Sequence, residues 1–287
     1  MNWLNILIQG GLLGGLYALF AIGLALSFGI MRLVNIAHGD FIVLAAYIAL
    51  ALIEATGIGA LASLVIVVPL MFAFGYALQR GILNFTLSGG LLSPLLVTFG
   101  ISVILQNGLL ATFTADSRRL AAGPIETASI EILPGLSLGI LPLIMFAVSV
   151  LLIFGLEWIF YRTSLGRAFR ATSDDAEIAQ LMMLDRRHVF GMAMALSAAV
   201  VAIAGIFLAI RTNFDPSSGP ARLLFGFEAV IIGGLGNLWG TLAGGIVLGV
   251  AQAIGAQISP GWQILAGHLV FFMVLALRPK GLFPRMD

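Results

Sequence analysis

Residues 4–30 read LNILIQGGLLGGLYALFAIGLALSFGI and contain no charged side chain. A bilayer crossing needs about 20 consecutive apolar residues, so this stretch is long enough to span a membrane as one helix. The rest of the chain has the same character. Of its 287 residues, 60% are hydrophobic and 9% are charged, and the mean hydropathy is +1.10. Because a soluble domain carries about 25% charged residues, the sequence predicts an integral membrane protein.

Apolar runs that end at polar, glycine or proline clusters divide the chain into nine segments. We therefore expect one all-α, polytopic transmembrane domain over residues 1–287, with eight to nine transmembrane segments. Two segments are shorter than the ~17 residues of an ordinary crossing and are expected to be short or broken helices. The segments lie at 4–30, 41–53, 58–79, 93–113, 138–160, 189–210, 223–235, 238–256 and 262–277.

The arginines and the single lysine are unevenly distributed between the two sides of this nine-segment topology. Ten of the fourteen cations fall on one side, which the positive-inside rule makes cytoplasmic. If 223–256 were one crossing, the split would be seven against seven, so two crossings are favoured. The topology predicts an external N-terminus, a cytoplasmic C-terminus, external loops at 114–137 and 211–222, and a long cytoplasmic loop at 163–188.

The stretch Met31–Phe41, MRLVNIAHGDF, interrupts two apolar segments with polar and flexible residues. One interpretation is a plain cytoplasmic loop in which Asn35 and Asp40 cap the next helix. The other is a broken helix at a translocation path, where Gly39 frees backbone groups and Asn35, His38 and Asp40 satisfy them. The residues alone leave both open.

A second interruption lies between Phe225 and Gly249. Glu228 sits inside an apolar run, and a carboxylate within a membrane segment indicates function unless it has a partner. Gly236 and Asn237 belong to a glycine cluster that breaks the helix, and this break is expected to correspond to the one at 31–41. Two interrupted segments in corresponding halves indicate a transporter site. His268 in the last segment is expected to form an interhelical hydrogen bond, and Gln106 in the fourth segment needs an internal partner.

The loop 163–188 concentrates five of the fourteen cations. Asp174 and Glu177 resemble a capping box, which predicts a helix that starts near Asp175. Residues 178, 181, 182 and 185 then share one face. A narrow apolar stripe between charges of both signs favours docking into a protein groove over lying on the bilayer, which stays the alternative.

Composition also excludes several kinds of chemistry. Cysteine is absent, which rules out disulfides and thiol catalysis, and His38, His188 and His268 are too scattered to suggest a metal site. The net charge of +1 does not favour binding to nucleic acid. The only lysine, Lys280, precedes Gly281, so a phosphate-binding Gly-Lys-Ser/Thr loop cannot form. No catalytic residues are expected, and any ATP and magnesium must be bound by partner chains.

Three separated motifs resemble the Liv-type permeases, the membrane subunits of bacterial ABC importers for branched-chain amino acids and related solutes. They are Gly15-Leu-Tyr-Ala-Leu through Asn35-Ile-Ala-His-Gly-Asp40, Leu165-Gly-Arg-Ala-x-Arg-Ala171, and Ile232-Gly-Gly-x-Gly-x-x-x-Gly-Thr-x-x-Gly244. One departure from the family is Met183-Leu184, where a glycine and a small hydrophobic residue are usual.

The resemblance implies an inner-membrane protein that works by alternating access with several partners. These are a second homologous permease, two cytoplasmic ATPase subunits and a periplasmic substrate-binding protein. It also implies that 163–188 contains the element that couples to the ATPase. Candidate pathway residues are Asn35, His38, Gly39, Asp40, Glu228, Gly236 and Asn237. Candidate coupling residues are Gly166, Arg167, Arg170, Asp175, Ile178, Leu181 and Asp185.

The expected path contains few ionisable groups. Such a path suits a neutral or zwitterionic solute such as an amino acid, urea or a short amide. The alternative is a self-sufficient, proton-coupled secondary transporter in which Asp40 and Glu228 relay protons. An intramembrane enzyme is disfavoured, since no His-Glu-x-x-His motif and no obvious Ser–His pair occurs.

Overall fold

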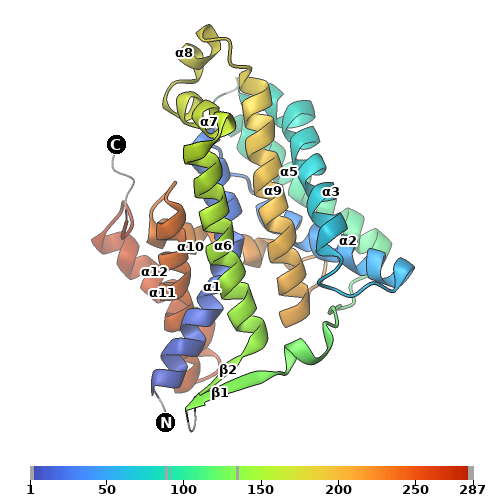
Figure 1. Ribbon diagram of the computed structural model, residues 1–287, viewed down its shortest axis with the longest axis vertical. Coiled ribbons are helices and arrows are strands. Elements are labelled where there is room, and N and C mark those ends of the chain that lie inside the picture. The colour runs from blue at the N-terminus through green and yellow to red at the C-terminus, as the bar shows by residue number, and fades with distance from the viewer. Residues whose placement is uncertain (1–2, 88–89, 91, 134–135, 284–287) are drawn as a thin grey trace.

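The computed structural model describes residues 3–87, 90, 92–133 and 136–283, and nearly all of its regular structure is helical (Figure 1). The helices are α1 (Trp3–Met31), α2 (His38–Thr56), α3 (Leu64–Leu78), α4 (Asn84–Thr86), α5 (Leu92–Phe113), α6 (Ile140–Arg162), α7 (Ser164–Asp174), α8 (Ala176–Leu181), α9 (Arg186–Arg211), α10 (Gly219–Gly233), α11 (Leu238–Ile258) and α12 (Trp262–Leu277).

Among the described residues, seven helical stretches are long and apolar enough to cross a membrane. The stretch Leu64–Thr86 counts once, because the π-helix Gln79–Leu83 joins α3 to α4. In the described part of the chain, one further apolar helix is shorter, α12 with 16 residues. Helix α10 has 15 residues and contains Arg222 and Glu228. The predicted polytopic all-α class is confirmed. Of the two segments predicted to be short, 223–235 corresponds to the 15-residue α10, but the prediction for 41–53 was wrong, because α2 has 19 residues and is long enough to cross.

Three other predicted boundaries were wrong. The segment predicted at 58–79 starts at Leu64 and stays helical to Thr86, because Gln79 donates a hydrogen bond to Asn84 (3.0 Å) and the chain continues as a π-turn. The predicted loop 211–222 ends at Gly219, since Pro220 suits the first turn of α10. The predicted loop 114–137 contains strand β1 (Ser129–Leu133), which pairs antiparallel with β2 (Leu136–Gly139).

The polar segments gather at two opposite ends of the bundle, α7 and α8 at the top of Figure 1 and the β1–β2 hairpin at the bottom. At the α7–α8 end Arg32 donates to the Ser173 carbonyl oxygen, and Arg80 lies 3.9 Å from Asp185. At the hairpin end Arg119 donates to the Ile210 carbonyl oxygen (3.1 Å). These arginines are therefore divided between the two ends as the nine-segment topology predicts.

Helices α1 and α9 form the buried centre and run in opposite directions. In each, 83% of the most apolar window is buried. Helix α1 packs on α10 and α11, while α9 packs on α2 and α3. In chain order the two sets are α1, α2 and α3, and α9, α10 and α11, and the first helix of each set packs on the other two helices of the other set. This is the arrangement of an inverted repeat.

Glycines allow the close approach of α1 and α11. A Cβ atom at Gly14 would lie 2.5 Å from the Ile246 Cα atom, and one at Gly245 would lie 2.6 Å from the Gly14 carbonyl oxygen. Gly249 abuts the Gly10 carbonyl oxygen. The small-residue faces thus pack helices within the bundle, as expected for such spacings.

Replacing Gly14 by alanine should therefore destabilise the protein. Alanine favours a helix over glycine by up to ~1 kcal/mol, but overlap with the α11 backbone should cost more, about 1–3 kcal/mol net. The matched control is Gly11→Ala on the same helix, where an added Cβ meets nothing within 4 Å. Thermal unfolding in detergent should show a lower midpoint for Gly14→Ala alone. Equal midpoints for the two variants would contradict this packing.

Candidate functional site

The first turns of α2 and α10 meet inside the bundle. A Cβ atom at Gly39 would overlap the Gly219 carbonyl oxygen, and one at Gly219 would overlap the Asp40 carboxylate. We call this contact, formed by residues 38–41 and 218–223, the half-helix junction. Gly219 was not among the predicted site residues, and the only local sequence signal for it is the Gly-Pro pair at a helix start.

The half-helix junction lies beside the middle of α1. His38 donates from Nε2 to the Phe20 carbonyl oxygen (2.8 Å), and a Cβ atom at Gly226 would lie 3.2 Å from the same oxygen. Helix α1 extends to Met31, so residues 32–37 return along its last turns to bring His38 level with Phe20. The segment 31–41 is therefore not a plain loop at the end of the bundle.

Asp40 supplies the negative charge at the half-helix junction. Its side chain is buried, and Oδ1 accepts a hydrogen bond from Gln106 Nε2 of α5 (3.0 Å). The N-cap residues of α2 and α10, Ala37 and Ser218, make no side-chain cap hydrogen bond. Helix N-termini carry partial positive charge, so the carboxylate is placed where two helix dipoles favour it. Gln106 thus has the internal partner that its position requires.

The neighbouring predicted residues have structural contacts of their own. Asn35 is buried, but it does not cap α2 as expected: the N-cap is Ala37, and Asn35 Oδ1 accepts from the amide of that residue (3.0 Å), before the first turn of the helix. Asp40 lies within the first turn and is not the N-cap either. His38 is buried against α1, where Gly23 leaves room for its ring.

Glu228 lies further along α10 and pairs with α12. It is buried, and its Oε1 accepts from His268 Nδ1 at 2.5 Å, which confirms the interhelical hydrogen bond expected for His268. Nine residues separate Glu228 from Gly219, which is about 13 Å along a helix. The structure therefore does not bring Glu228 and Asp40 together.

Gly236 and Asn237 form the turn between α10 and α11. Gly236 has a φ of 80°, and Asn237 caps α11 by accepting from the Gly240 amide (2.9 Å). Their turn packs near Gly29 and away from the half-helix junction. The interruption that corresponds to 31–41 is thus the segment before α10, at 212–218, and the expected correspondence with the glycine cluster was wrong.

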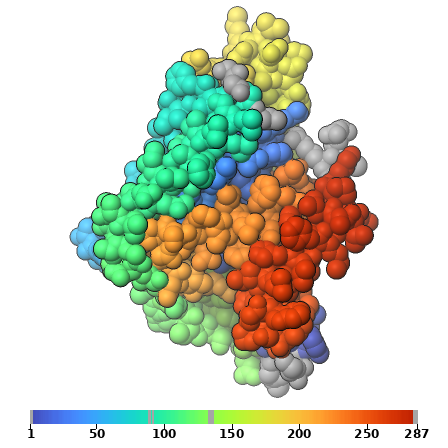
Figure 2. All heavy atoms as spheres, turned by 180° about the vertical axis from the view of Figure 1, so that it is seen from behind, coloured from blue at the N-terminus to red at the C-terminus, as the bar shows by residue number. Residues whose placement is uncertain are grey.

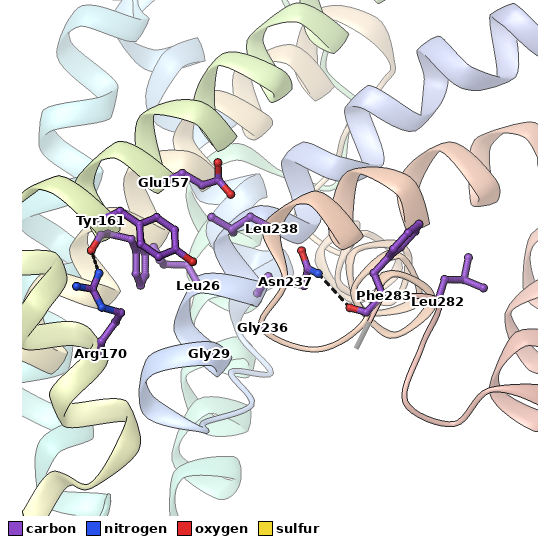
Figure 3. Close-up of a pocket in the computed structure, with 12 residues that line it drawn as sticks. Leu26, Gly29, Glu157, Tyr161, Arg170, Gly236, Asn237, Leu238, Leu282 and Phe283 are labelled. Atoms are coloured by element: carbon purple, nitrogen blue, oxygen red, sulfur yellow. Dashed lines mark hydrogen bonds between the residues drawn. The ribbon is translucent and has the colours of Figure 1, made fainter. Parts of the chain in front are cut away.

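This turn lines a cavity of about 770 Å³ toward the α7–α8 end. Figure 3 shows Glu157, Tyr161 and Arg170 on one side of the cavity and Asn237 on the other, with Asn237 donating to the Phe283 carbonyl oxygen (3.0 Å). The cavity combines a carboxylate, a guanidinium and an amide, so it is a polar space below α7.

The coupling region consists of helices α7 and α8, followed by the start of α9. Helix α8 begins at Ala176, one residue from the predicted start, but its N-cap is Asp175 and not Asp174: Asp175 Oδ1 accepts from the amides of Glu177 (2.9 Å) and Ile178 (3.0 Å). Helix α7 was not predicted. Thr163 caps it by accepting from the Gly166 amide (3.1 Å).

Four of the seven predicted coupling residues hold this region together. A Cβ atom at Gly166 would overlap the last turn of α6, and Arg170 donates to the Phe160 carbonyl oxygen and lies over the Tyr161 ring. Asp175 caps α8, and Asp185 caps α9 by accepting from the Arg187 amide (2.9 Å).

The remaining three, Arg167, Ile178 and Leu181, are exposed. The apolar side chains at the end of α8 reach exposed fractions of 83% for Leu181, 75% for Met182 and 95% for Met183. We call Ile178, Leu181, Met182 and Met183 the apolar tip; in Figure 1 it is the outermost part of the α7–α8 end. Met183 has a φ of +61°, a conformation that favours glycine. The position where this chain departs from the Liv-type pattern is therefore a strained turn.

The comparisons with known proteins agree on one family. The family model described as "Branched-chain amino acid transport system / permease component" matches residues 6–277. The permease protein BraD of the Pseudomonas aeruginosa high-affinity branched-chain amino acid transport system is 29% identical over 100% of this chain and 97% of its own length. LivH of Escherichia coli is 26% identical over the same shares. A shorter match, 30% identical over 43% of this chain and 29% of its own length, is to LivM, another permease protein of the E. coli system. The search of solved structures found no match.

Proposed function

The chain belongs to the family of branched-chain amino acid transport system permease components, and we propose that it forms half of the translocation path of an ATP-driven importer. It is a multi-pass membrane protein and a transport subunit. The proposed solutes are branched-chain amino acids or a related small solute such as another amino acid, urea or a short amide. The proposed cellular location is the bacterial inner membrane.

The half-helix junction is the observation that supports this proposal. Two helices, α2 and α10, start beside the middle of α1 and leave backbone amides inside the protein, and such breaks occur where backbone lines a cavity or a path. On the face seen in Figure 2, the chain around α10 (orange) lies between α5 (green) and α12 (red). We propose that this face meets a second permease and that the path runs between them.

The proposed partners follow from the family. A second, homologous permease is supported by the match to LivM. Two cytoplasmic ATPase subunits would bind ATP and magnesium, because this chain has no Gly-Lys-Ser/Thr loop. A periplasmic binding protein would deliver the solute at the hairpin end. In this proposal the α7–α8 end is cytoplasmic and the N-terminus is periplasmic, as the arginine asymmetry favours.

The apolar tip is the proposed contact with the ATPase. Exposed apolar side chains on a protruding helix suit a groove in a partner, and Arg170 links α7 to the wall of the cavity that Asn237 also lines. Movement of α7 would therefore act on that cavity directly. The contacts of α7 with α6 therefore support a coupling route in which the ATPase binds the apolar tip and moves α7 relative to α6.

A proton relay through Asp40 and Glu228 is not supported. Asp40 lies in the first turn of α2 and Glu228 lies further along α10, and Glu228 is already bonded to His268. Replacing Glu228 by glutamine keeps a hydrogen-bond acceptor for His268, so ATP-driven uptake should change little. A relay carboxylate would lose at least about 100-fold in rate. Initial uptake rates in proteoliposomes distinguish the two results, and Glu228→Leu, which leaves His268 without its partner, serves as the structural control.

A further inference from the structure

A second cavity, of about 260 Å³, opens between α1, α9, α10, α11 and α12 in the half of the bundle nearer the hairpin end. Its polar lining consists of Tyr17, Arg211, Thr212, Arg222, Gln252 and, at its exposed rim, Gln263. We call it the arginine cavity. Of these residues only Arg222 also belongs to the half-helix junction, and none belongs to the coupling region. The Thr212 hydroxyl already donates to the Leu208 carbonyl oxygen (3.3 Å).

The arginine cavity holds hydrogen-bond donors without acceptors. Tyr17 donates to Gln252 Oε1, so the side chain of Gln252, which is 1% exposed, has only its Nε2 donor left. That nitrogen, Arg211 Nη1 and Arg222 Nε are all buried without a hydrogen-bond partner. Within the part of the chain that the structure describes, neither arginine makes an ion pair.

The nearest carboxylates are engaged elsewhere. Asp215 accepts hydrogen bonds from the hydroxyls of Ser217 (2.5 Å) and Ser218 (2.8 Å) and from the Ser217 amide. Burial raises the pKa of Asp215, but these hydrogen bonds and the charge of Arg222 outweigh it and lower the pKa. Asp215 is thus an ionised carboxylate held within its own turn. Glu228 is bonded to His268 through Oε1, and its Oε2, which is buried without a hydrogen-bond partner, makes no ion pair with either arginine.

Arg222 also adds positive charge where the backbone is already positive. It lies in the first turn of α10, which contains no acidic residue and no side-chain cap. Helix N-termini favour anions, so a half-buried arginine there is unfavourable unless an anion joins it. Asp215 favours the charge of Arg222 from the preceding turn, but among the described residues Arg222 makes no ion pair. A charged side chain without an ion pair in the membrane part of a protein indicates a functional site.

We propose that the arginine cavity binds the carboxylate of the transported solute, with Arg211 and Arg222 holding its oxygens and Gln252 adding a neutral donor. Arginine is suited to bidentate recognition of carboxylates. The remaining lining is apolar and includes Leu13, Leu16 and Phe225, which gives an aliphatic side chain a place to lie. This inference rests on the proposed function, because it makes the cavity the first site on the permease side of the path.

Arginine modification by phenylglyoxal tests the site without changing the sequence. In the assembled transporter, the modification of each arginine is measured by peptide mass mapping with and without L-leucine. We expect L-leucine and 4-methylpentanoate, which both carry the carboxylate, to slow modification of Arg211 and Arg222 several-fold. Leucinamide, which lacks the carboxylate, should not. Arg118 on the same face is the internal control and should react at one rate throughout.

Three results would overturn the carboxylate assignment: equal protection by leucinamide, protection by inorganic phosphate but not by L-leucine, or protection by vesicles rich in phosphatidylglycerol with no solute present. If ATP-driven leucine uptake occurs but neither arginine is protected, the cavity assignment fails and the proposed function stands. If uptake is absent while 4-methylpentanoate still protects, the proposed function fails and the carboxylate site stands.

A variant adds a transport readout. Arg222→Gln should raise the concentration of leucine needed for half-maximal uptake by about tenfold or more, the loss expected for one charged hydrogen bond. Arg118→Gln removes the same charge from the same face outside the cavity and should leave that concentration unchanged. An unchanged concentration in Arg222→Gln protein that is inserted and assembled would contradict the proposal.

Discussion

Replacing Gly39 by alanine is expected to abolish uptake by the assembled transporter. The added methyl group would overlap the Gly219 carbonyl oxygen and press on the Leu223 amide nitrogen, 2.8 Å away. Both neighbours are backbone atoms of α10, so no side-chain rotation relieves the contact. Either α2 and α10 separate or the protein fails to fold, and we expect a loss of more than about tenfold in uptake rate, since a few kcal/mol exhausts much of a protein's stability.

The control for Gly39→Ala is Gly100→Ala on α5, where an added Cβ atom meets nothing within 4 Å. This variant also gains helix propensity and should transport normally. Membrane insertion and assembly are measured for both variants by size-exclusion chromatography of a fluorescent fusion. Normal uptake by Gly39→Ala protein would mean that the two half-helices do not meet as described.

Replacing Leu181 by aspartate is expected to uncouple the permease from its motor. Leu181 is 83% exposed and makes up part of the apolar tip, so the change should not disturb the fold. A carboxylate in an apolar groove of the ATPase would be buried without a partner, and central interface residues of this kind cost 2 kcal/mol or more, about 30-fold in affinity. Solute-stimulated ATP hydrolysis and uptake should both fall, while the permease remains stable.

The matched control adds the same charge one residue away. Gln180 is exposed on α8 but lines a small cavity with Asn84 and Arg187, on the side that faces the bundle. Gln180→Asp should therefore couple nearly as well as the unchanged chain. Equal loss in both variants would indicate a general effect of charge at the α7–α8 end, and normal coupling in Leu181→Asp would remove the apolar tip from the interface.

The sequence predicted the half-helix at α2 better than the one at α10. Polar residues at 35, 38 and 40 interrupt an otherwise apolar stretch, and interruptions of this kind are visible in one dimension. The partner of Gly39 was missed because 211–222 contains Arg211, Asp215, Pro216 and Arg222 and so resembles an ordinary external loop. Only packing on Phe20 and Gly39 shows that α10 starts within the bundle.

The roles of Glu228 and Asn237 needed the fold for a different reason. A carboxylate within an apolar run indicates a functional site or a buried pair, and the partner, His268, is 40 residues away in another helix. Asn237 follows a glycine cluster, which predicts a break but not whether it faces a path. The structure makes it the cap of α11.

In the coupling region, the sequence predicted where α8 starts but not the contacts between residues that are distant in the sequence. The start of α8 follows from capping, which is local. The helical face predicted at 178, 181, 182 and 185 was wrong beyond Leu181, because α8 ends there and Asp185 is the N-cap of α9. Helix α7 was missed because its side chains are mainly small and polar; its burial comes from Phe169, whose ring packs on Phe160 of α6. The contact of Arg170 with the end of α6 could not be inferred from spacing alone.

The decisive measurement is uptake of radiolabelled L-leucine into proteoliposomes that contain this chain with its second permease and ATPase subunits. Uptake should require enclosed ATP and external binding protein, and it should persist when the pH gradient is collapsed. Uptake by this chain alone, driven by a pH gradient and indifferent to ATP, would contradict the importer function.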